Sequence, residues 1–234
     1  KAVDRVSFAV QQGEFIGVMG ASGSGKTTLL NLLSTIDRVT AGHIYYGDTD
    51  ITELGEEQLS EFRKKQLGFI FQEYNLLDTL TLEENIMLVM TLHRRGKKEI
   101  QKRCRELLRI LGIEEVKDKY PYQVSGGQKQ RCACARALAN YPTLLLADEP
   151  TGALDSLAAQ TLLETFTEMN KNMGATILMV THDAFSASYC SRILFLKDGR
   201  IFHELVRGEK ERRAFLNEIL DVMTLTGGER SHDV

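Results

Sequence analysis

An α/β domain with a mostly parallel central sheet is the fold class that the sequence predicts. Short, continuous apolar runs of strand length alternate along the chain with segments whose apolar residues recur at helical spacing. Such runs are typical of strands covered on both faces, and their alternation with helices is typical of parallel sheets. The chain has 234 residues, 43% of them hydrophobic and 26% charged, which is the composition of an ordinary globular protein.

Seven segments are expected to form strands, and the last of them is expected to be a hairpin that turns at Asp198-Gly199. In chain order the segments are VSFAV (6–10), EFIGVMG (14–20), GHIYYG (42–47), LGFIFQ (67–72), TLLLADE (143–149), ATILMVTH (175–182) and RILFLKDGRIF (192–202). Helical patterns lie at Gly25–Thr35, Lys98–Leu111, Gly126–Asn140 and Ser156–Asn172. A final helix is expected to pack on the body through Phe215, Ile219, Leu220 and Met223.

Residues 73–141 contain no strand pattern, so we expect them to form a helical lobe inserted into the sheet domain. Residues 1–72 and 142–206 would then form the core, and residues 207–234 a C-terminal helix and tail. The first residue is Lys1 rather than Met, and a strand pattern follows almost at once. We therefore expect the chain to begin inside a domain, with no segment that resembles a signal peptide.

The net charge argues against nucleic acid as the main ligand, and the lengths of the apolar runs argue against a membrane-spanning segment. The net charge of −3 gives no electrostatic reason to expect a nucleic acid ligand. No apolar run approaches the ~18 to 20 residues that cross a bilayer. The four cysteines, Cys104, Cys132, Cys134 and Cys190, are expected to be free thiols in a reducing compartment. Cys132 and Cys134 are two apart in a helical pattern, so they point to nearly opposite faces and cannot share a metal.

The segment GASGSGKTT matches the phosphate-loop pattern of glycine, four residues, Gly-Lys and then Ser or Thr. The candidate phosphate-binding residues are Gly20, Ala21, Ser22, Gly23, Ser24, Gly25, Lys26, Thr27 and Thr28. Backbone N–H groups of such a loop converge on phosphate oxygens at the positive end of the helix that follows. Lys26 is expected to reach the β- and γ-phosphates, and the Thr27 hydroxyl to bind Mg²⁺.

The segment TLLLADEP delivers two carboxylates to the end of a buried strand, where open α/β sheets bind their ligands. Asp148 is expected to hold Mg²⁺ through its water shell. Glu149 comes one residue later, where a water that attacks the γ-phosphate needs a general base. An acidic pair after a strand can also be an ordinary helix start, and it is the complete phosphate loop upstream that favours catalysis.

The order of five motifs resembles the nucleotide-binding domain of ABC transporters, and the resemblance covers nearly the whole chain. The motifs are GASGSGKTT, FIFQ, VSGGQ, LLLADEPTGALD and VTHD. The resemblance implies a P-loop NTPase fold with a mostly parallel RecA-like core, an antiparallel β subdomain and an inserted helical subdomain. It also implies ATP and Mg²⁺ as ligands and a location at the cytoplasmic face of the bacterial plasma membrane, beside an integral-membrane permease subunit.

Several residue roles rest on this resemblance alone. Gln72 is similar to the glutamine that senses the γ-phosphate and Mg²⁺ and touches the transport subunit, and His182 to the switch histidine at the γ-phosphate. Ser125, Gly126, Gly127 and Gln128 resemble the signature motif, and Ala153-Leu154-Asp155 the D-loop. Without the family, a histidine after an apolar strand is more often a satisfied structural group, and Gln72 would carry no functional interpretation.

The signature motif also starts a helical pattern, so it offers a second anion site far along the chain from the phosphate loop. We expect the helical lobe to hold it away from the chain's own ATP. A second copy related by a two-fold axis would place its signature motif over that ATP, and the reverse, so ATP binding is expected to form a homodimer.

Three features depart from the family pattern. Val124 replaces the more usual leucine before the signature motif, Cys132 and Cys134 add oxidisable thiols to its helix, and the aromatic residue that stacks on adenine is expected before Lys1. Three segments resemble the bacterial branch that exports or detoxifies peptide antibiotics: GEFIGVMGASGSGKTTLLNLLSTID, DEPTGALDS and THDAFSASYCSRILFLKDGRI. KYPYQVSGGQ and the ending FLNEILDVMTLTGG strengthen the resemblance to the bacitracin-resistance type. Lipoprotein-releasing and macrolide-exporting systems are its near relatives.

Three other functions are alternatives to transport. A P-loop kinase or small GTPase needs neither VSGGQ nor a histidine after a late strand. ABC ATPases of DNA repair separate their halves by long coiled coils, and ribosomal members usually carry two nucleotide domains in one chain. This sequence has neither feature. The nucleotide motifs leave open a non-transporting ATPase that signals through a membrane partner, as in cell-division complexes.

Overall fold

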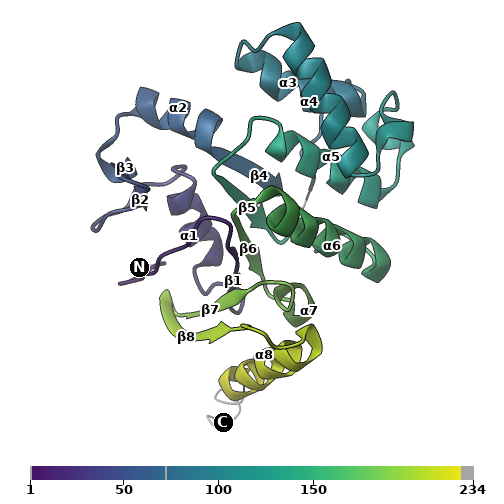
Figure 1. The fold of residues 1–234 in the computed structure, drawn as a ribbon. Helices are drawn as coiled ribbons and strands as arrows, with labels where there is room; N and C mark the ends of the chain where they lie inside the picture. Colours follow the sequence, from purple (N-terminus) through teal and green to yellow (C-terminus); the bar gives the residue numbers. More distant parts are fainter. Residues whose placement is uncertain (1, 72, 228–234) are drawn as a thin grey trace.

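The computed structural model describes residues 2–71 and 73–227 (Figure 1). Its main sheet has six strands in the order β4-β5-β6-β1-β7-β8. They are β1 (Phe15–Met19), β4 (Leu67–Phe71), β5 (Leu144–Asp148), β6 (Ile177–Thr181), β7 (Arg192–Lys197) and β8 (Arg200–Val206). All neighbours pair in parallel except β7 and β8, so the predicted α/β class with a mostly parallel sheet is confirmed.

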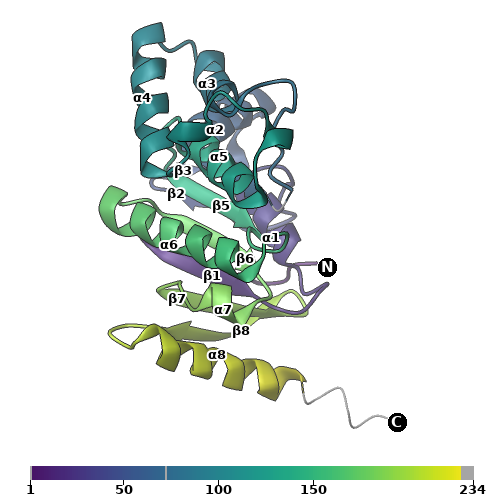
Figure 2. The same ribbon diagram turned by 90° about the vertical axis from the view of Figure 1, so that its right-hand side faces the viewer.

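Helices surround this sheet, and a second, two-stranded antiparallel sheet lies beside it. The helices are α1 (Lys26–Leu33), α2 (Glu56–Gln66), α3 (Leu82–Leu92), α4 (Lys97–Ile110), α5 (Gly126–Leu138), α6 (Ser156–Met173), α7 (Ala184–Ala187) and α8 (Arg212–Gly227). The small sheet pairs β2 (Tyr45–Tyr46) with β3 (Thr49–Asp50). Figures 1 and 2 both show α3 and α4 at one end of the molecule and α8 at the other.

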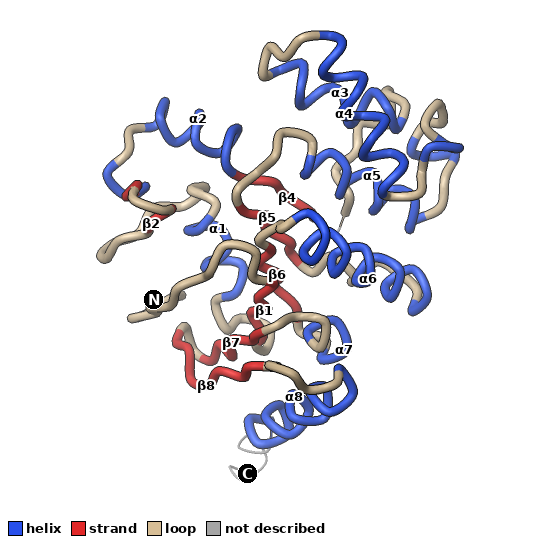
Figure 3. Tube along the Cα trace, in the orientation of Figure 1, coloured by secondary structure: helices blue, strands red, loops and turns tan. Residues whose placement is uncertain are grey.

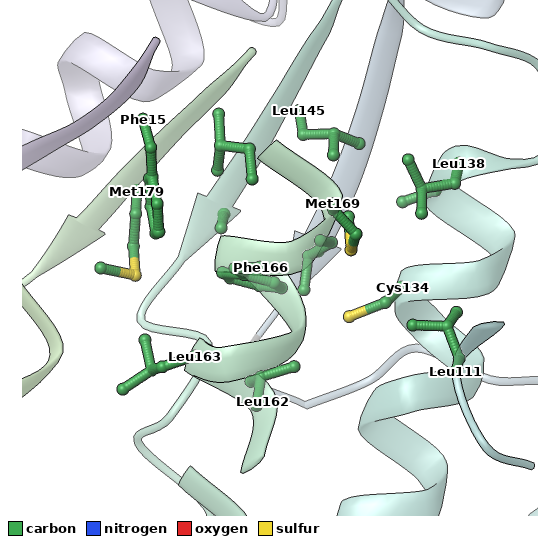
Figure 4. Close-up of a cluster of buried hydrophobic side chains, with 14 of the residues drawn as sticks. Phe15, Leu111, Cys134, Leu138, Leu145, Leu162, Leu163, Phe166, Met169 and Met179 are labelled. Carbon is green, nitrogen blue, oxygen red and sulfur yellow. The ribbon is translucent and has the colours of Figure 1, made fainter. Parts of the chain in front are cut away.

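Successive side chains of a strand point to opposite faces of the sheet, and each face has its own apolar cluster. Phe15 and Leu145 belong to the cluster that includes α5 and α6, as Figure 4 shows. Their neighbours Ile16 and Leu146 belong to the other cluster, which includes Leu29 and other residues of α1. The helices α1 and α5 therefore pack on opposite faces of the sheet.

The helical lobe is built from α3, α4 and α5, and residues 73–141 contain no strand, as the sequence predicted. The four cysteines are buried free thiols. Two of them donate weak hydrogen bonds to the start of α3: Cys104 Sγ to Glu83 O at 3.8 Å and Cys132 Sγ to Leu82 O at 3.5 Å. Burial raises the pKa of Cys132 to about 12 and so disfavours its thiolate, the form that reacts with oxidants.

The prediction of a strand at residues 6–10 is wrong: the segment is drawn as a loop in Figure 3. Its side chains do alternate between partly buried and exposed, and Val6, Phe8 and Val10 pack on the α1-side cluster. In the described part of the chain, however, this segment forms no ladder with a neighbouring strand. The backbone hydrogen bonds that flank it join Asp4 N to Gly199 O at 2.8 Å and Glu14 N to Gln11 O at 3.0 Å. The alternation of apolar residues reflects burial of one side of the segment, and not pairing with a neighbouring strand.

The hairpin of β7 and β8 and helix α8 test two further expectations, and helix α2 was not expected. The hairpin of β7 and β8 turns at Asp198 and Gly199, whose φ values of 50° and 75° suit a tight primed turn. Helix α8 packs through Phe215 and Ile219, both fully buried, but Leu220 is 45% exposed, so its predicted packing role is wrong. Helix α2 was not predicted, because Leu59 is its only buried residue and its apolar pattern is correspondingly weak.

Candidate nucleotide site

Four strands end at the same edge of the sheet and carry most of the predicted site there. The register pairs Phe71 with Asp148, Asp148 with Val180, and Met19 with Thr181. The phosphate loop follows β1, the acidic pair closes β5, and His182 follows β6. Segments more than 100 residues apart in the sequence therefore meet at the carboxyl ends of parallel strands, where such sheets bind ligands.

The phosphate loop is tightly folded around the lysine side chain. Lys26 is 8% exposed, and its ammonium group donates to Gly20 O at 2.8 Å and to Ala21 O at 3.0 Å. A Cβ at Gly20 would lie 2.3 Å from Leu196 O, so only glycine fits there. Gly25 has φ of 106° and a Cβ on it would lie 2.2 Å from Ala2 O. The loop thus presents its backbone, with one buried cation at its centre.

The start of α1 fits an anion. No side chain accepts a hydrogen bond from its first N–H groups, and its first turn carries no acidic residue. By contrast, Thr81, Ser125 and Asp155 cap α3, α5 and α6 with side-chain oxygens. In addition, Ser24 Oγ is buried without a hydrogen-bond partner in the described part of the chain. Unpaired donors at the positive end of a helix are what a phosphate group would satisfy.

The acidic pair lies opposite this cation. Burial raises the pKa of Asp148, and the adjacent Glu149 carboxylate raises it further, whereas the Lys26 charge lowers it. Thr27 is exposed beside Lys26, so a hydroxyl and a carboxylate are available at the rim of the loop. Mg²⁺ in nucleotide sites takes one or two protein oxygens and completes its shell with phosphate and water. Thr27 and Asp148 fit that chemistry, and the described residues contain no cluster of three metal-binding side chains.

Glu149 and His182 form a pair that spans two strands. Glu149 Oε1 lies 2.9 Å from His182 Nδ1, and the His182 backbone N–H donates to Glu149 Oε2 at 3.3 Å. The Glu149 side chain is 19% exposed and that of His182 is 69% exposed. The Glu149 backbone has φ of 45°, a left-handed conformation that is uncommon for a residue with a side chain. A carboxylate is thereby held at the edge of the sheet with a solvent-facing imidazole beside it.

The signature segment forms the capped start of α5. Ser125 Oγ accepts from Gln128 N at 3.3 Å, and Gln128 Oε1 accepts from Ser125 N at 3.0 Å. The N–H groups of Gly126 and Gly127 have no intrahelical acceptor. Because α5 packs on the other sheet face from α1, the signature residues do not join the chain's own phosphate loop.

Of two other predicted site residues, the structure describes Asp155 but not Gln72. Asp155 caps α6 by accepting a hydrogen bond from Ala158 N at 2.9 Å, and Leu154 of the same loop lies next to Gly126. Gln72 lies outside the described residues. The residues that follow it are held by the signature helix, because Arg136 donates to Tyr74 O at 2.9 Å and also to Asn75 O.

Sequence reasoning missed three polar contacts around the acidic pair. Gln130 donates from α5 to Pro150 O at 3.0 Å, and Thr151 Oγ1 lies 3.0 Å from Ser186 Oγ. Ser186 also donates to Asp183 Oδ2 at 2.7 Å, next to His182. No sequence signal identifies the first two contacts, because they join residues that only the tertiary fold brings together. The third is local, since Asp183 is the N-cap residue of α7.

The comparisons with known proteins agree with this arrangement. The sequence model described as ABC transporter matches residues 3–152. The bacitracin export ATP-binding protein BceA of Halalkalibacterium halodurans is 50% identical over 223 residues, which cover 95% of this chain and 88% of that protein. The ABC transporter ATP-binding protein YxdL of Bacillus subtilis is 50% identical over 228 residues, 97% of this chain and 88% of that one.

A solved structure is similar as well. The ATP-binding cassette MJ0796 of Methanocaldococcus jannaschii, a dimer in a post-hydrolysis state bound to ADP and Pi, superposes with a TM-score of 0.79 at 39% identity. The match covers 88% of this chain and 90% of that one. In the described part of this chain, no helix is long and apolar enough to cross a membrane.

Proposed function

The chain belongs to the ABC transporter family, and from that premise we propose that it is the ATP-hydrolysing subunit of a bacterial transporter that exports or detoxifies antimicrobial peptides. One observation carries the enzymatic part. The phosphate loop, the acidic pair and His182 meet at one edge of the sheet, although they come from three distant parts of the chain. The peptide substrate rests on the 50% identity to a bacitracin export protein.

The binding roles follow from charge and backbone geometry. Lys26 and the uncapped N–H groups of α1 would hold the β- and γ-phosphates of ATP. Thr27, Asp148 and Gln72 would hold Mg²⁺, which neutralises charge on the phosphate oxygens when it is bound. Lys26 now donates to two loop carbonyls, and these bonds would be exchanged for charge-assisted bonds to phosphate.

We assign Glu149 as the general base of the hydrolytic step. A water oxygen attacks the γ-phosphorus, the bond from phosphorus to the ADP oxygen breaks, and the Glu149 carboxylate takes a proton from the water. His182 contacts both this carboxylate and the solvent side of the edge, so we assign it to the γ-phosphate. The left-handed backbone at Glu149 aims the carboxylate away from the strand direction.

A homodimer would complete each site. The signature residues offer N–H groups at the start of α5, on the opposite sheet face from the chain's own loop. A two-fold axis would bring Ser125, Gly126, Gly127 and Gln128 of a second copy over the first copy's ATP, with Asp155 at the same interface. The dimer bound to ADP and Pi in the related cassette supports the stoichiometry.

The conformational changes that accompany ATP binding and hydrolysis would act on an integral-membrane permease. The chain would lie on the cytoplasmic face of the membrane. Export across a bilayer requires membrane spans, and the described residues supply none. The segment after residue 72 is the proposed contact. Tyr74 is partly buried against the signature helix, whereas Leu77 is 48% exposed, so Leu77 is available to a partner.

Turnover by two variants tests the enzymatic proposal. Glu149→Gln is expected to bind ATP normally while turnover falls by about 10²- to 10⁴-fold, because a neutral amide cannot accept the proton. Lys26→Ala is expected to weaken ATP binding itself. Steady-state phosphate release and binding of a fluorescent ATP analogue measure the two effects. Glu168→Gln, an exposed change on α6, is the matched control and should leave both unchanged. Near-normal turnover in Glu149→Gln would contradict the assignment.

A further inference from the structure

The side chain of Gln130 joins the signature helix to the catalytic segment within one chain. Gln130 is fully buried on α5, and its Nε2 donates to Pro150 O at 3.0 Å. Pro150 directly follows Glu149. Only a donor can serve here, so the orientation of the amide is fixed by its partner. The other amide atom, Oε1, is buried without a hydrogen-bond partner among the described residues.

This contact reaches a strained segment from outside the sheet. The left-handed Glu149 is tied to the sheet by its N–H, which donates to Val180 O at 2.9 Å, and to its own turn by Gly152 N to Glu149 O at 3.0 Å. Gln130 adds a tie from the helical lobe. A strained conformation persists only where its surroundings hold it, so a shift of α5 changes the restraint on Glu149.

Helix α5 can transmit such a shift as a unit. Gln130 lies little more than one turn beyond Ser125, at 1.5 Å of rise per residue. Between them the helix is stiffened by the reciprocal bonds of Ser125 and Gln128. Packing anchors the rest, because Cys132 and Cys134 are fully buried. Because the signature residues and Gln130 share this short, stiffened part of the helix, a displacement of the signature residues would also move Gln130.

We infer that Gln130 is a positioning residue that couples the two ATP sites of the dimer. The inference rests on the proposed function, in which the start of α5 contacts ATP bound by the second copy. Binding at that site moves α5, and Gln130 passes the movement to Pro150 and so to the carboxylate that hydrolyses the chain's own ATP. The unpaired Oε1 fits this role, since a buried polar atom without a partner costs stability and calls for an explanation outside the packing of the fold.

The dependence of hydrolysis on ATP concentration tests the coupling. The wild-type chain is expected to show a Hill coefficient between 1 and 2, because two sites are linked. Gln130→Met fills a similar volume without a donor and is expected to lower the Hill coefficient to about 1 while ATP still binds. Thermal unfolding checks that the variant is folded, and Gln130→Leu replaces it if Gln130→Met does not fold.

A matched control lies just past the other end of the same helix. Asn140 Nδ2 donates to Val89 O at 3.2 Å, and Asn140 Oδ1 is likewise buried without a partner among the described residues. Its contacts stay inside the helical lobe, with His93 Nδ1 at 2.9 Å. Asn140→Leu removes the same kind of amide and is expected to keep the wild-type Hill coefficient. A fall in both variants would mean that any loosening of the lobe abolishes coupling, and would overturn the role of Gln130.

The remaining outcomes separate the two proposals. A wild-type chain that dimerises with ATP but has a Hill coefficient of 1, or a folded Gln130→Met with the wild-type coefficient, contradicts the inference alone. A wild-type chain that neither dimerises nor hydrolyses ATP contradicts the proposed function, and the inference with it.

Discussion

Glu149 combines a reactive carboxylate with a backbone conformation that L-residues rarely adopt, at φ of 45°. A side chain in the left-handed region costs roughly 1 to 2 kcal/mol. Two backbone hydrogen bonds offset that cost: Glu149 N–H donates to Val180 O, and Gly152 N–H donates to Glu149 O. The carboxylate is therefore positioned by the end of β5. The His182 imidazole lies beside it and could exchange this contact for one with a bound phosphate.

The buried thiols make stability depend on alkaline pH. Burial raises the pKa of Cys104 and of Cys132 from 9.0 to about 12, and it raises the pKa of Cys134 and Cys190 as well. Above pH 9 the unfolded chain loses thiol protons that the folded chain keeps, so the free energy of unfolding falls as the pH rises. Each thiol contributes a slope of ~1.4 kcal/mol per pH unit in that range.

Urea unfolding between pH 10 and 11, where the thiols of the unfolded chain are mostly ionised and those of the folded chain are not, measures that slope. Cys104→Ala is expected to reduce the slope of the unfolding free energy against pH by the contribution of one thiol, ~1.4 kcal/mol per pH unit. Ser34→Ala, which removes a buried hydroxyl that does not titrate, should keep the wild-type slope. Equal slopes in the wild type and Cys104→Ala would show that Cys104 does not contribute.

At this scale the sequence predicted residues that belong to contiguous motifs. Lys26, Asp148 and Glu149 stand in patterns whose spacing carries the chemistry, and the structure brings them together. Gln130 and Ser186 could not be predicted, because their partners lie 20 and 35 residues away in the sequence and only packing makes them neighbours. The roles of His182 and Gln72 came from the family pattern alone.

Among the elements, the strands with both faces covered were the most predictable. β1, β5 and β6 are mostly apolar runs of 5 residues each, and this length, too short for a typical helix, favours strands. The segment 6–10 shows the limit of that reasoning. Alternation specifies which side chains are buried, whereas a ladder also requires a neighbouring strand, which local sequence does not encode. Helix α2 shows the converse, since a mostly solvated helix needs few apolar residues.

The segment between β4 and α3 gives an element-scale prediction. Asn85 holds its backbone by accepting from Leu77 N at 2.8 Å and donating to Leu77 O at 3.1 Å, so the Leu77 side chain is presented from a fixed loop. Leu77→Glu is expected to leave basal ATPase activity unchanged and to abolish peptide resistance in cells, because a charge at the contact uncouples the permease.

Leu92→Glu is the matched control, since Leu92 is 71% exposed at the end of α3 and should tolerate the charge with resistance intact. Full resistance with folded Leu77→Glu would refute the contact. Loss of both activities would instead mean that Leu77 supports the fold of the lobe.

For the whole molecule, the opposite placement of α1 and α5 predicts ATP-dependent assembly. Glu149→Gln is expected to be monomeric without nucleotide and to double its mass with ATP, since bound ATP is not consumed and joins both copies. Light scattering after size exclusion measures the mass. Lys26→Ala combined with Glu149→Gln should remain monomeric because it lacks the phosphate contact, and a persistent Glu149→Gln monomer at saturating ATP would contradict the dimer.

Each chain would contribute its phosphate loop to one ATP site of the proposed dimer and its signature segment to the other. This division has a genetic consequence. A chain with a damaged signature segment still binds ATP through its own loop and still pairs with an intact chain, so it disables the ATP held by that partner. With equal expression and random pairing, only about a quarter of the dimers carry two intact sites. Mutations at Ser125 or Gly126 should therefore be dominant over the wild-type allele, whereas mutations that unfold the chain should be recessive.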